Sequence, residues 1–419
     1  MSELFRFIRE FIRNKGLMVF LSILVSRLSM LGINIIAARM ITKDEFGLIS
    51  LVFSVFAIFA PLTGLGSYQG LLRYGVLETS QDAKDNLSRY VFGKGLFNHL
   101  IIICIYIAIS YIYTLRYGGI QIVILLFAVR LLGYYFQNFI ESYFRIHHDN
   151  KMFAWIGMIT GVGGFLMVLA GTWFWGMLGY LVALAVMPWL SFLFYRREAF
   201  SGIITMPSIN LKEFWRYSFH GGLTYFLSDI LFSMDFMLIG FLLDGHAIAM
   251  YKTAIILPMS LAILPQIFMQ TDYPKLALKY ADKSYLLFYL KNYYKIFIPL
   301  GIIILIVGFL LRDRIIPFIF GEQYAGNGIV FFIILAALVG NMWLRNLYGN
   351  LSSAIGKAQW NTYASLAAIV IILGLGLWLI PIMGIEGAAI GMAAAFTFTG
   401  LMTMILFHKY LRNLGHERN

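Results

Sequence analysis

Charged residues and cysteine are scarce in this 419-residue chain. Charged residues make up 12% of the sequence, whereas an ordinary soluble domain has roughly 25%. Hydrophobic residues make up 60%, whereas a soluble domain has roughly 45–50% apolar residues. We therefore predict an integral membrane protein. The single cysteine, Cys104, has no intrachain partner. This excludes an internal disulfide and leaves the cellular compartment open.

Motifs for bond chemistry are also lacking. No Gly-x4-Gly-Lys-Ser/Thr phosphate loop occurs, which argues against an ATP-driven pump in this chain. The adjacent His147 and His148 stand without a further His or Cys cluster, so a solvated loop is favoured over a metal site there. We therefore expect no cofactor, no metal and no catalytic residues.

Long apolar runs fill most of the chain. Each is about 20 residues or more, the length that a helix needs to cross the hydrocarbon core. The runs are continuously apolar and too long for the alternating strands of a β-barrel, so we predict an all-α fold. Twelve transmembrane helices are expected, at Gly16–Met40, Phe46–Leu72, Tyr90–Tyr113, Gly119–Glu141, Met152–Phe174, Gly176–Tyr195, Phe214–Leu243, Ala247–Thr271, Leu286–Leu311, Asn327–Ser352, Ala358–Pro381 and Ile385–His408.

Lysine and arginine indicate the orientation. If both termini are cytoplasmic, most of the 32 Lys and Arg residues fall in cytoplasmic segments, as the positive-inside rule requires. The net charge of +12 then reflects basic loops that face anionic membrane lipids, and nucleic-acid binding is not expected. Residues 4–13 alternate apolar side chains with arginine, which predicts an amphipathic helix in the membrane interface and no cleavable signal.

The spans divide into two halves at the basic connection Arg196–Lys212. Trp175-Gly176-Met177-Leu178-Gly179 opens the sixth span, and the similar Met383-Gly384-Ile385-Glu386-Gly387 opens the twelfth. Because each repeat has an even number of helices, both halves enter from the same side as parallel repeats. We predict two six-helix lobes, residues 1–205 with the amphipathic N-terminal segment and residues 206–419, around a central cavity.

Three arginines, Arg27, Arg130 and Arg345, lie inside long apolar spans. A cation near the bilayer centre costs roughly 2.5 to 3.5 kcal/mol even on lenient insertion scales, so it usually faces a wet cavity or a partner charge. Arg27 and Asn34 are seven residues apart and share a face of the first span.

Polar residues recur at helical spacing in two corresponding spans. The fourth span carries one stripe, of Arg130, Tyr134, Gln137 and Glu141. The tenth span carries another, of Asn341, Arg345, Tyr348 and Ser352. Each stripe could be a hydrogen-bonded or ion-paired seam between helices, or part of a wet cavity. The stripes together favour a cationic cavity whose arginines bind phosphate oxygens.

Acidic residues within the spans are candidates for ion coupling. Asp235 and Asp229 lie in the seventh span and Glu141 ends the fourth. A buried carboxylate titrates easily when its access changes, so these acids could couple transport to H+ or Na+, and pairing with an arginine is the alternative. Pro258 and Pro265 in the eighth span would bend that helix.

Several short stretches together resemble a known family. They are Ala38–Leu48 (ARMITKDEFGL), Asp235–Leu242 (DFMLIGFL) with Ala249–Ala254 (AMYKTA), Gly321–Tyr324 (GEQY), Gly349–Lys357 (GNLSSAIGK) and Pro381–Ala389 (PIMGIEGAA). In this order they are similar to the oligosaccharide (O-antigen, Wzx-type) flippases of the polysaccharide transport branch of the multidrug/oligosaccharidyl-lipid/polysaccharide (MOP) exporter superfamily. One departure is Ile49, where the family turn usually has Tyr.

The resemblance implies a V-shaped pair of six-helix lobes in a bacterial inner membrane. Such a protein turns a polyprenyl-diphosphate-linked oligosaccharide from the cytoplasmic to the external leaflet, and polysaccharide polymerase and chain-length proteins are candidate partners. The family's cavity is cationic, so we expect the diphosphate to bind among six residues, namely Arg27, Asn34, Arg130, Tyr134, Gln137 and Arg345.

Two alternatives differ in chemistry. The same superfamily contains cation-coupled exporters of small drugs, which a predominantly anionic, aromatic cavity would favour. A membrane polymerase or ligase would need a large external loop with catalytic Arg or His. The longest external connection, Arg312–Gly326, is short and holds no histidine, which argues against an enzyme.

Overall fold

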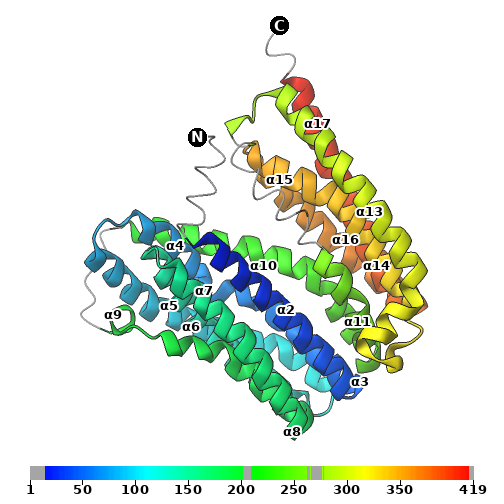
Figure 1. Ribbon diagram of the computed structural model, residues 1–419, viewed down its shortest axis with the longest axis horizontal. Helices are drawn as coiled ribbons and strands as arrows, with labels where there is room; N and C mark the ends of the chain where they lie inside the picture. The colour runs from blue at the N-terminus through cyan, green and yellow to red at the C-terminus, as the bar shows by residue number, and fades with distance from the viewer. Residues whose placement is uncertain (1–14, 202–208, 262–264, 266–275, 277, 415–419) are drawn as a thin grey trace. The chain divides into compact units, whose positions relative to one another are not determined.

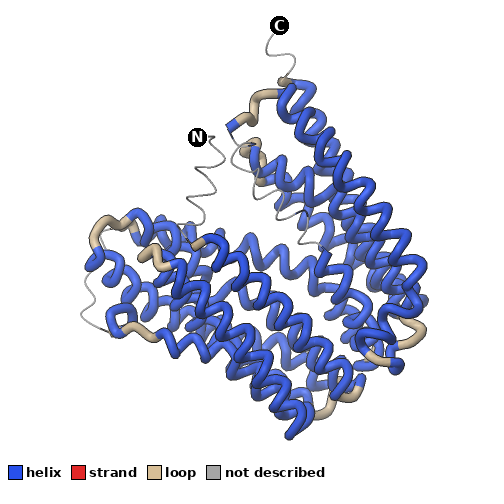
Figure 2. Tube along the Cα trace, viewed as in Figure 1, coloured by secondary structure: helices blue, strands red, loops and turns tan. Residues whose placement is uncertain are grey.

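The computed structural model describes residues 15–201, 209–261, 265, 276 and 278–414 (Figure 1). The predicted amphipathic segment at residues 4–13 lies outside this part of the chain. All secondary structure in the described residues is helical, which confirms the predicted all-α class (Figure 2).

The chain forms two compact units, Met1–Asp229 and Ile230–Asn419. The first unit contains the helices α2 (Gly16–Met40), α3 (Lys43–Phe59), η1 (Ala60–Gly66), α4 (Ser67–Leu77), α5 (Gln81–Ser110), η2 (Tyr111–Leu115), α6 (Ile120–Ile146), α7 (Asn150–Met158), η3 (Ile159–Gly163), α8 (Gly164–Val186), η4 (Met187–Phe194) and α9 (Arg197–Phe200). Helix α10 (Leu211–Leu242) runs through the boundary between the units.

The second unit contains α11 (Gly245–Leu261), α13 (Lys283–Phe320), η5 (Glu322–Tyr324), α14 (Gly328–Asn341), η6 (Met342–Asn346), α15 (Leu347–Ala354), α16 (Gln359–Met383) and α17 (Ile385–Asn413). Helix α17 packs along α16 and α14, and α14 also contacts α11 and α13. Aromatic residues form much of the core of this unit, where the rings of Tyr293 and Phe297 stack with their centroids 4.3 Å apart.

Ten helical segments of the described chain are long and apolar enough to cross a membrane. One of them, Asn150–Phe194, holds both the predicted fifth and sixth spans. The predicted eighth span begins as α11, whose 17 residues are shorter than the other segments, and continues into residues outside the described part. The ten segments therefore hold eleven of the twelve predicted spans, and α11 begins the remaining one.

In each unit, a glycine with the same backbone conformation forms the turn of a helical hairpin. Gly176 has φ 56° and ψ −135°, and Gly384 has φ 60° and ψ −137°, in the left-handed region that favours glycine. Beyond the first turn the backbones of Gly171 and Gly179 approach so closely that a Cβ on Gly179 would lie 1.9 Å from the Gly171 oxygen. The two turns fall in the motifs that predicted an internal repeat.

The second span begins as predicted and then breaks. Thr42 and Glu45 form a capping box at the start of α3, with the Thr42 hydroxyl 2.8 Å from the Glu45 carboxylate. At Thr63 the backbone leaves the helix (φ −48°, ψ 122°), and the next three residues have φ of 57°, 56° and 73° before α4 resumes. Non-helical backbone at membrane depth occurs where protein buries it or where it lines a cavity.

The first part of α10 packs against this break. A Cβ on Gly66 would lie 2.2 Å from the Ser218 carbonyl oxygen, and one on Gly70 would lie 2.1 Å from the Ser218 hydroxyl. Small residues therefore allow α10 to approach the backbone of the break closely. This contact explains why the first compact unit extends into α10 as far as Asp229.

Candidate functional site

Arg130 is the most deeply buried of the three arginines in the apolar spans. It lies on α6, is 5% exposed, and donates from Nη1 to the backbone oxygen of Leu184 on α8 at 2.7 Å. Its guanidinium carbon lies 5.4 Å from the centroid of the Phe56 ring, and its Nε has no hydrogen-bond partner in the described part of the chain. No ion pair involves Arg130 among the described residues. A guanidinium carries five donors, so most of its capacity is unused.

The rest of the α6 stripe is half-buried. Gln137 donates to Glu141 at 2.8 Å, so these two predicted residues bind each other. Tyr134 packs edge-on against Phe56 with the ring centroids 5.9 Å apart, which places it beside Arg130. The structure thus brings the whole predicted stripe of the fourth span onto one side of α6.

Asp229 belongs to the same region of the first unit. Tyr134 lies near enough to Tyr68, Glu141 and Asp229 to interact with each electrostatically. Asp229 is half-buried, and no ion pair involves it among the described residues. Two acids, two tyrosine hydroxyls and one arginine therefore share this polar region, which we call the α6 site.

Arg27 and Asn34 do not join the α6 site through any contact of the described residues. The Asn34 amide donates to the Met30 oxygen of its own helix at 2.7 Å. Arg27 is exposed, beside the exposed apolar residues Leu24 and Leu28. A charged side chain exposed at this depth requires water or an anionic ligand, because lipid would not solvate it.

Arg345 lies in the π-helical turn η6 of the second unit. Its Nη2 donates to the Ser365 hydroxyl at 3.3 Å, and its guanidinium lies 5.8 Å from the centroid of the Phe396 ring. Like Arg130, it contacts a phenylalanine ring and a neutral oxygen, and the described residues provide it with no ion pair. π-Turns are frequent at functional sites.

The two corresponding stripes place their arginines at different distances from the starts of their helices. Arg130 lies about 15 Å along its helix from Ile120, and Arg345 about 25 Å from Gly328, at 1.5 Å per residue. Asn341, Tyr348 and Ser352 are buried in the second unit, and the Tyr348 hydroxyl lies 3.2 Å from that of Tyr294. The second stripe is therefore largely part of the core.

Asp235 lies in a different environment from Asp229. It is 1% exposed and accepts a 2.5 Å hydrogen bond from the Tyr251 hydroxyl of α11. Phe236 packs edge-on against Tyr251, and the Lys252 ammonium lies 5.3 Å from the centroid of the Phe236 ring. The two motifs DFMLIGFL and AMYKTA thus form one cluster where α10 turns into α11.

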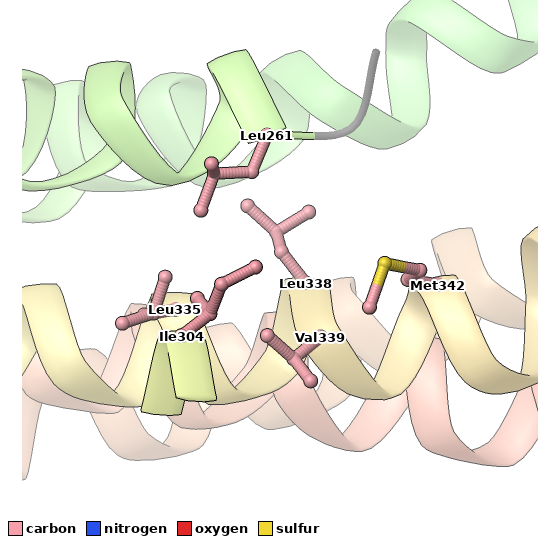
Figure 3. Close-up of a pocket in the computed structure, with 6 residues that line it drawn as sticks. All are labelled: Leu261, Ile304, Leu335, Leu338, Val339 and Met342. Atoms are coloured by element: carbon pink, nitrogen blue, oxygen red, sulfur yellow. The ribbon is translucent and has the colours of Figure 1, made fainter. Parts of the chain in front are cut away.

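A pocket in the second unit is entirely apolar. Figure 3 shows its lining of Leu261, Ile304, Leu335, Leu338, Val339 and Met342, from α11, α13, α14 and η6. None of these side chains carries a charge or a strong hydrogen-bonding group, so the pocket does not suit a phosphate. Within the described residues no group of three or more His, Cys, Asp or Glu could hold a metal ion.

Three features of the first unit were not predicted from sequence. They are the break after Pro61, the hydrogen bond of 3.4 Å from Asn138 to the Thr63 hydroxyl, and buried His99. The Pro61-x-x-Gly64-x-Gly66 spacing inside an apolar run signals such a break. His99 carries no comparable sequence signal, because its partners come from two other segments.

Solved structures with the same fold are membrane transporters. The chain is similar to a multidrug resistance MATE family transporter of the MOP superfamily in its inward-facing conformation (TM-score 0.75, 14% identity, covering 93% of this chain and 96% of the other). It is also similar to the lipid II flippase MurJ (TM-score 0.71, 14% identity, 95% and 90%) and to a MOP superfamily transporter from Pyrococcus furiosus (TM-score 0.62, 14% identity, 96% of both). The protein therefore has the MOP superfamily fold and is a multi-pass membrane protein.

A sequence-family model narrows the class further. It matches residues 12–277, and the chain belongs to the family it describes, polysaccharide biosynthesis protein. No curated protein sequence matches the chain significantly.

Proposed function

We propose that this protein flips a polyprenyl-diphosphate-linked oligosaccharide, such as an O-antigen or capsule repeat unit, across a bacterial inner membrane. The substrate passes from the cytoplasmic to the external leaflet by alternating access, and both termini lie in the cytoplasm. The protein makes and breaks no covalent bond. The undecaprenyl tail of the substrate would remain in lipid while the diphosphate and sugars cross.

The unsatisfied guanidinium of Arg130 carries this proposal. A buried cation without a counter-charge is costly, because neither Leu184 nor the Phe56 ring replaces the lost water. A diphosphate offers several charged oxygens, which the planar guanidinium can bind bidentately. Membership of a polysaccharide biosynthesis family supplies the glycan part of the proposal.

Binding at Arg130 requires a local rearrangement. The guanidinium is 5% exposed and lies between Leu184 of α8 and the Phe56 ring, so these contacts would have to loosen before a phosphate could reach its unused donors. Substrate binding would therefore be coupled to separation of α6 from α8 at this level. Arg27, Asn34, Tyr134, Gln137 and Arg345 complete the proposed substrate-binding set in the two units.

The acids Glu141, Asp229 and Asp235 are the proposed coupling groups for H+ or Na+. Glu141 and Asp229 are half-buried beside Tyr134 in the α6 site, where a titration would change the local charge directly. Asp235 already accepts two hydrogen bonds, from Tyr251 at 2.5 Å and from its neighbouring amide at 2.9 Å. Its titration would therefore disturb the packing of α10 on α11.

A second candidate is a cation-coupled multidrug exporter. The acids of the α6 site together with Tyr68 and Tyr134 favour it, because carboxylates and aromatic rings suit cationic drugs. The two candidates predict opposite ligand charges. Reconstituted protein that exports an organic cation and ignores diphosphate lipids would favour the exporter.

The test is transport of a fluorescent undecaprenyl-diphosphate-linked oligosaccharide in proteoliposomes. The triple variant Arg27→Ala, Arg130→Ala, Arg345→Ala should lose transport, and the three Lys replacements should impair it less because they retain the charge. Arg312→Ala is the matched control, since Arg312 lies on α13 and pairs with the exposed carboxylate of its neighbour Asp313. Unaltered transport by the folded triple variant would reject the arginine site.

A further inference from the structure

Three buried side chains, Tyr135, His99 and Tyr106, join helices α5 and α6 through hydrogen bonds to backbone carbonyl oxygens. The Tyr135 hydroxyl donates to Phe92 at 2.7 Å, and the Tyr106 hydroxyl donates to Ile124 at 3.3 Å. Between them, Nε2 of His99 lies 2.9 Å from the Leu131 oxygen. All three side chains are buried, so the bonds hold the helices in register.

Of these three side chains, His99 is the one that also forms a hydrogen bond with the break in the second span. The backbone N–H of Gly64 donates to its Nδ1 at 3.4 Å. A carbonyl oxygen can only accept and an amide N–H can only donate, so the ring must be neutral with its proton on Nε2. The two contacts together define one tautomer and one orientation.

The bond to Gly64 supports an unusual stretch of backbone. Leu65 has φ 56°, a left-handed conformation that is strained for a residue with a Cβ. Gly64 is buried, and its N–H would lack a partner without His99, which costs about 1 to 3 kcal/mol for a buried donor. The Tyr135 ring stacks on His99 at 5.0 Å and limits how the imidazole can tilt.

The other end of His99 holds the residue next to Arg130. Leu131 follows Arg130 on α6, so a bond to the Leu131 carbonyl constrains the position of α6 at the level of the guanidinium. We propose that His99 is a positioning residue, which ties the break in the second span to Arg130 and so sets the affinity for the diphosphate. This inference rests on the proposed function of Arg130.

The experiment is a double-mutant cycle on lipid binding. Affinity for undecaprenyl diphosphate, a probe without sugar, is measured on the full-length protein in detergent for His99→Asn, His99→Gln, Arg130→Ala and each double variant. Asn places an acceptor near Nδ1 and keeps the Gly64 bond, whereas Gln places a donor near Nε2 and keeps the Leu131 bond. Because each retains one bond, the cycle can be completed with whichever variant folds.

Tyr106→Phe is the matched control. It removes a buried bond from α5 to an α6 carbonyl, as the His99 variants do, without contacting the break or the residue beside Arg130. When Arg130 is intact, we expect each His99 variant to weaken the affinity about fivefold to tenfold. When the protein also carries Arg130→Ala, we expect the His99 variants to change the affinity hardly at all. Tyr106→Phe should leave the affinity unchanged in both backgrounds.

Three outcomes would overturn this inference. If the His99 and Arg130 effects multiply independently, or if Tyr106→Phe weakens binding as much, His99 is only a core residue. If Arg130→Ala itself binds the probe with wild-type affinity, the arginine site of the proposed function fails and the inference fails with it. The Arg130 single variant therefore distinguishes the two failures.

Discussion

The hydroxyl of Tyr251 donates a 2.5 Å hydrogen bond to the carboxylate of Asp235, and both side chains are buried. The bond joins α10 to α11 near the turn between them. An acid in an apolar span is usually read as a functional group. This contact provides Asp235 with a structural role as well, because removing either partner leaves the other buried and unsatisfied.

We expect Asp235→Ala to lower the free energy of unfolding by about 1 to 3 kcal/mol, the cost of leaving a buried polar group unpaired. Asp235→Asn keeps an acceptor for Tyr251 and should cost less. Thermal denaturation in detergent measures both variants, with Asp244→Asn as a control at the exposed N-cap of α11. Equal melting temperatures for wild type and Asp235→Ala would contradict the structural role.

Arg130→Met should separate stability from function. Methionine fills a similar volume without the unpaired charge, so the melting temperature should stay the same or rise, as when a buried charge is replaced by an apolar side chain. Diphosphate binding should fall at least about tenfold, which corresponds to about 1.4 kcal/mol. A variant that melts lower and still binds the probe would show that the guanidinium serves packing.

Gly64→Ala should destabilise the protein strongly. A Cβ there would lie 2.4 Å from the Ser67 hydroxyl and 2.8 Å from the Tyr135 ring, at φ +57°. Gly93→Ala is the matched control, because Gly93 lies within helix α5, with nothing within 4 Å of an added Cβ. The control should be neutral or slightly more stable, since alanine favours a helix by up to about 1 kcal/mol. Comparable melting temperatures for both variants would argue against the break as described.

Glu141→Gln should change ion dependence and spare binding. The amide can still accept from Gln137, so the contact at 2.8 Å survives while the titratable group is lost. If Glu141 couples transport to an ion, the variant should bind undecaprenyl diphosphate normally and no longer respond to an imposed H+ or Na+ gradient. Transport by Glu141→Gln that follows the gradient as the wild type does would assign the coupling elsewhere, with Asp229→Asn as the next variant.

Much of the fold follows from local sequence. The first predicted span has the bounds of α2, and the capping box at Thr42 and Glu45 forms as expected. Gly176 and Gly384, which mark the predicted repeat, adopt the same left-handed turn. Each of these features depends on residues that are neighbours in the chain, so it can be predicted from the local sequence.

The candidate site was only partly predictable. The spacing of Arg130, Tyr134, Gln137 and Glu141 correctly placed them on one side of α6, and the bond between Gln137 and Glu141 follows from it. The spacing did not show that Arg130 donates to Leu184 or that Asp235 accepts from Tyr251. These partners belong to other helices, and no helical period encodes which helix comes next to another.

The sequence by itself determined that this chain is a helical membrane protein and approximately where most of its spans lie. Hydrophobic run length, turn glycines and capping residues act over a few neighbouring positions. Only the tertiary structure decided that the described residues give Arg130 no counter-charge and that His99 links Gly64 to Leu131. Burial and hydrogen bonding of a side chain depend on which distant segments surround it, and packing alone brings those segments together.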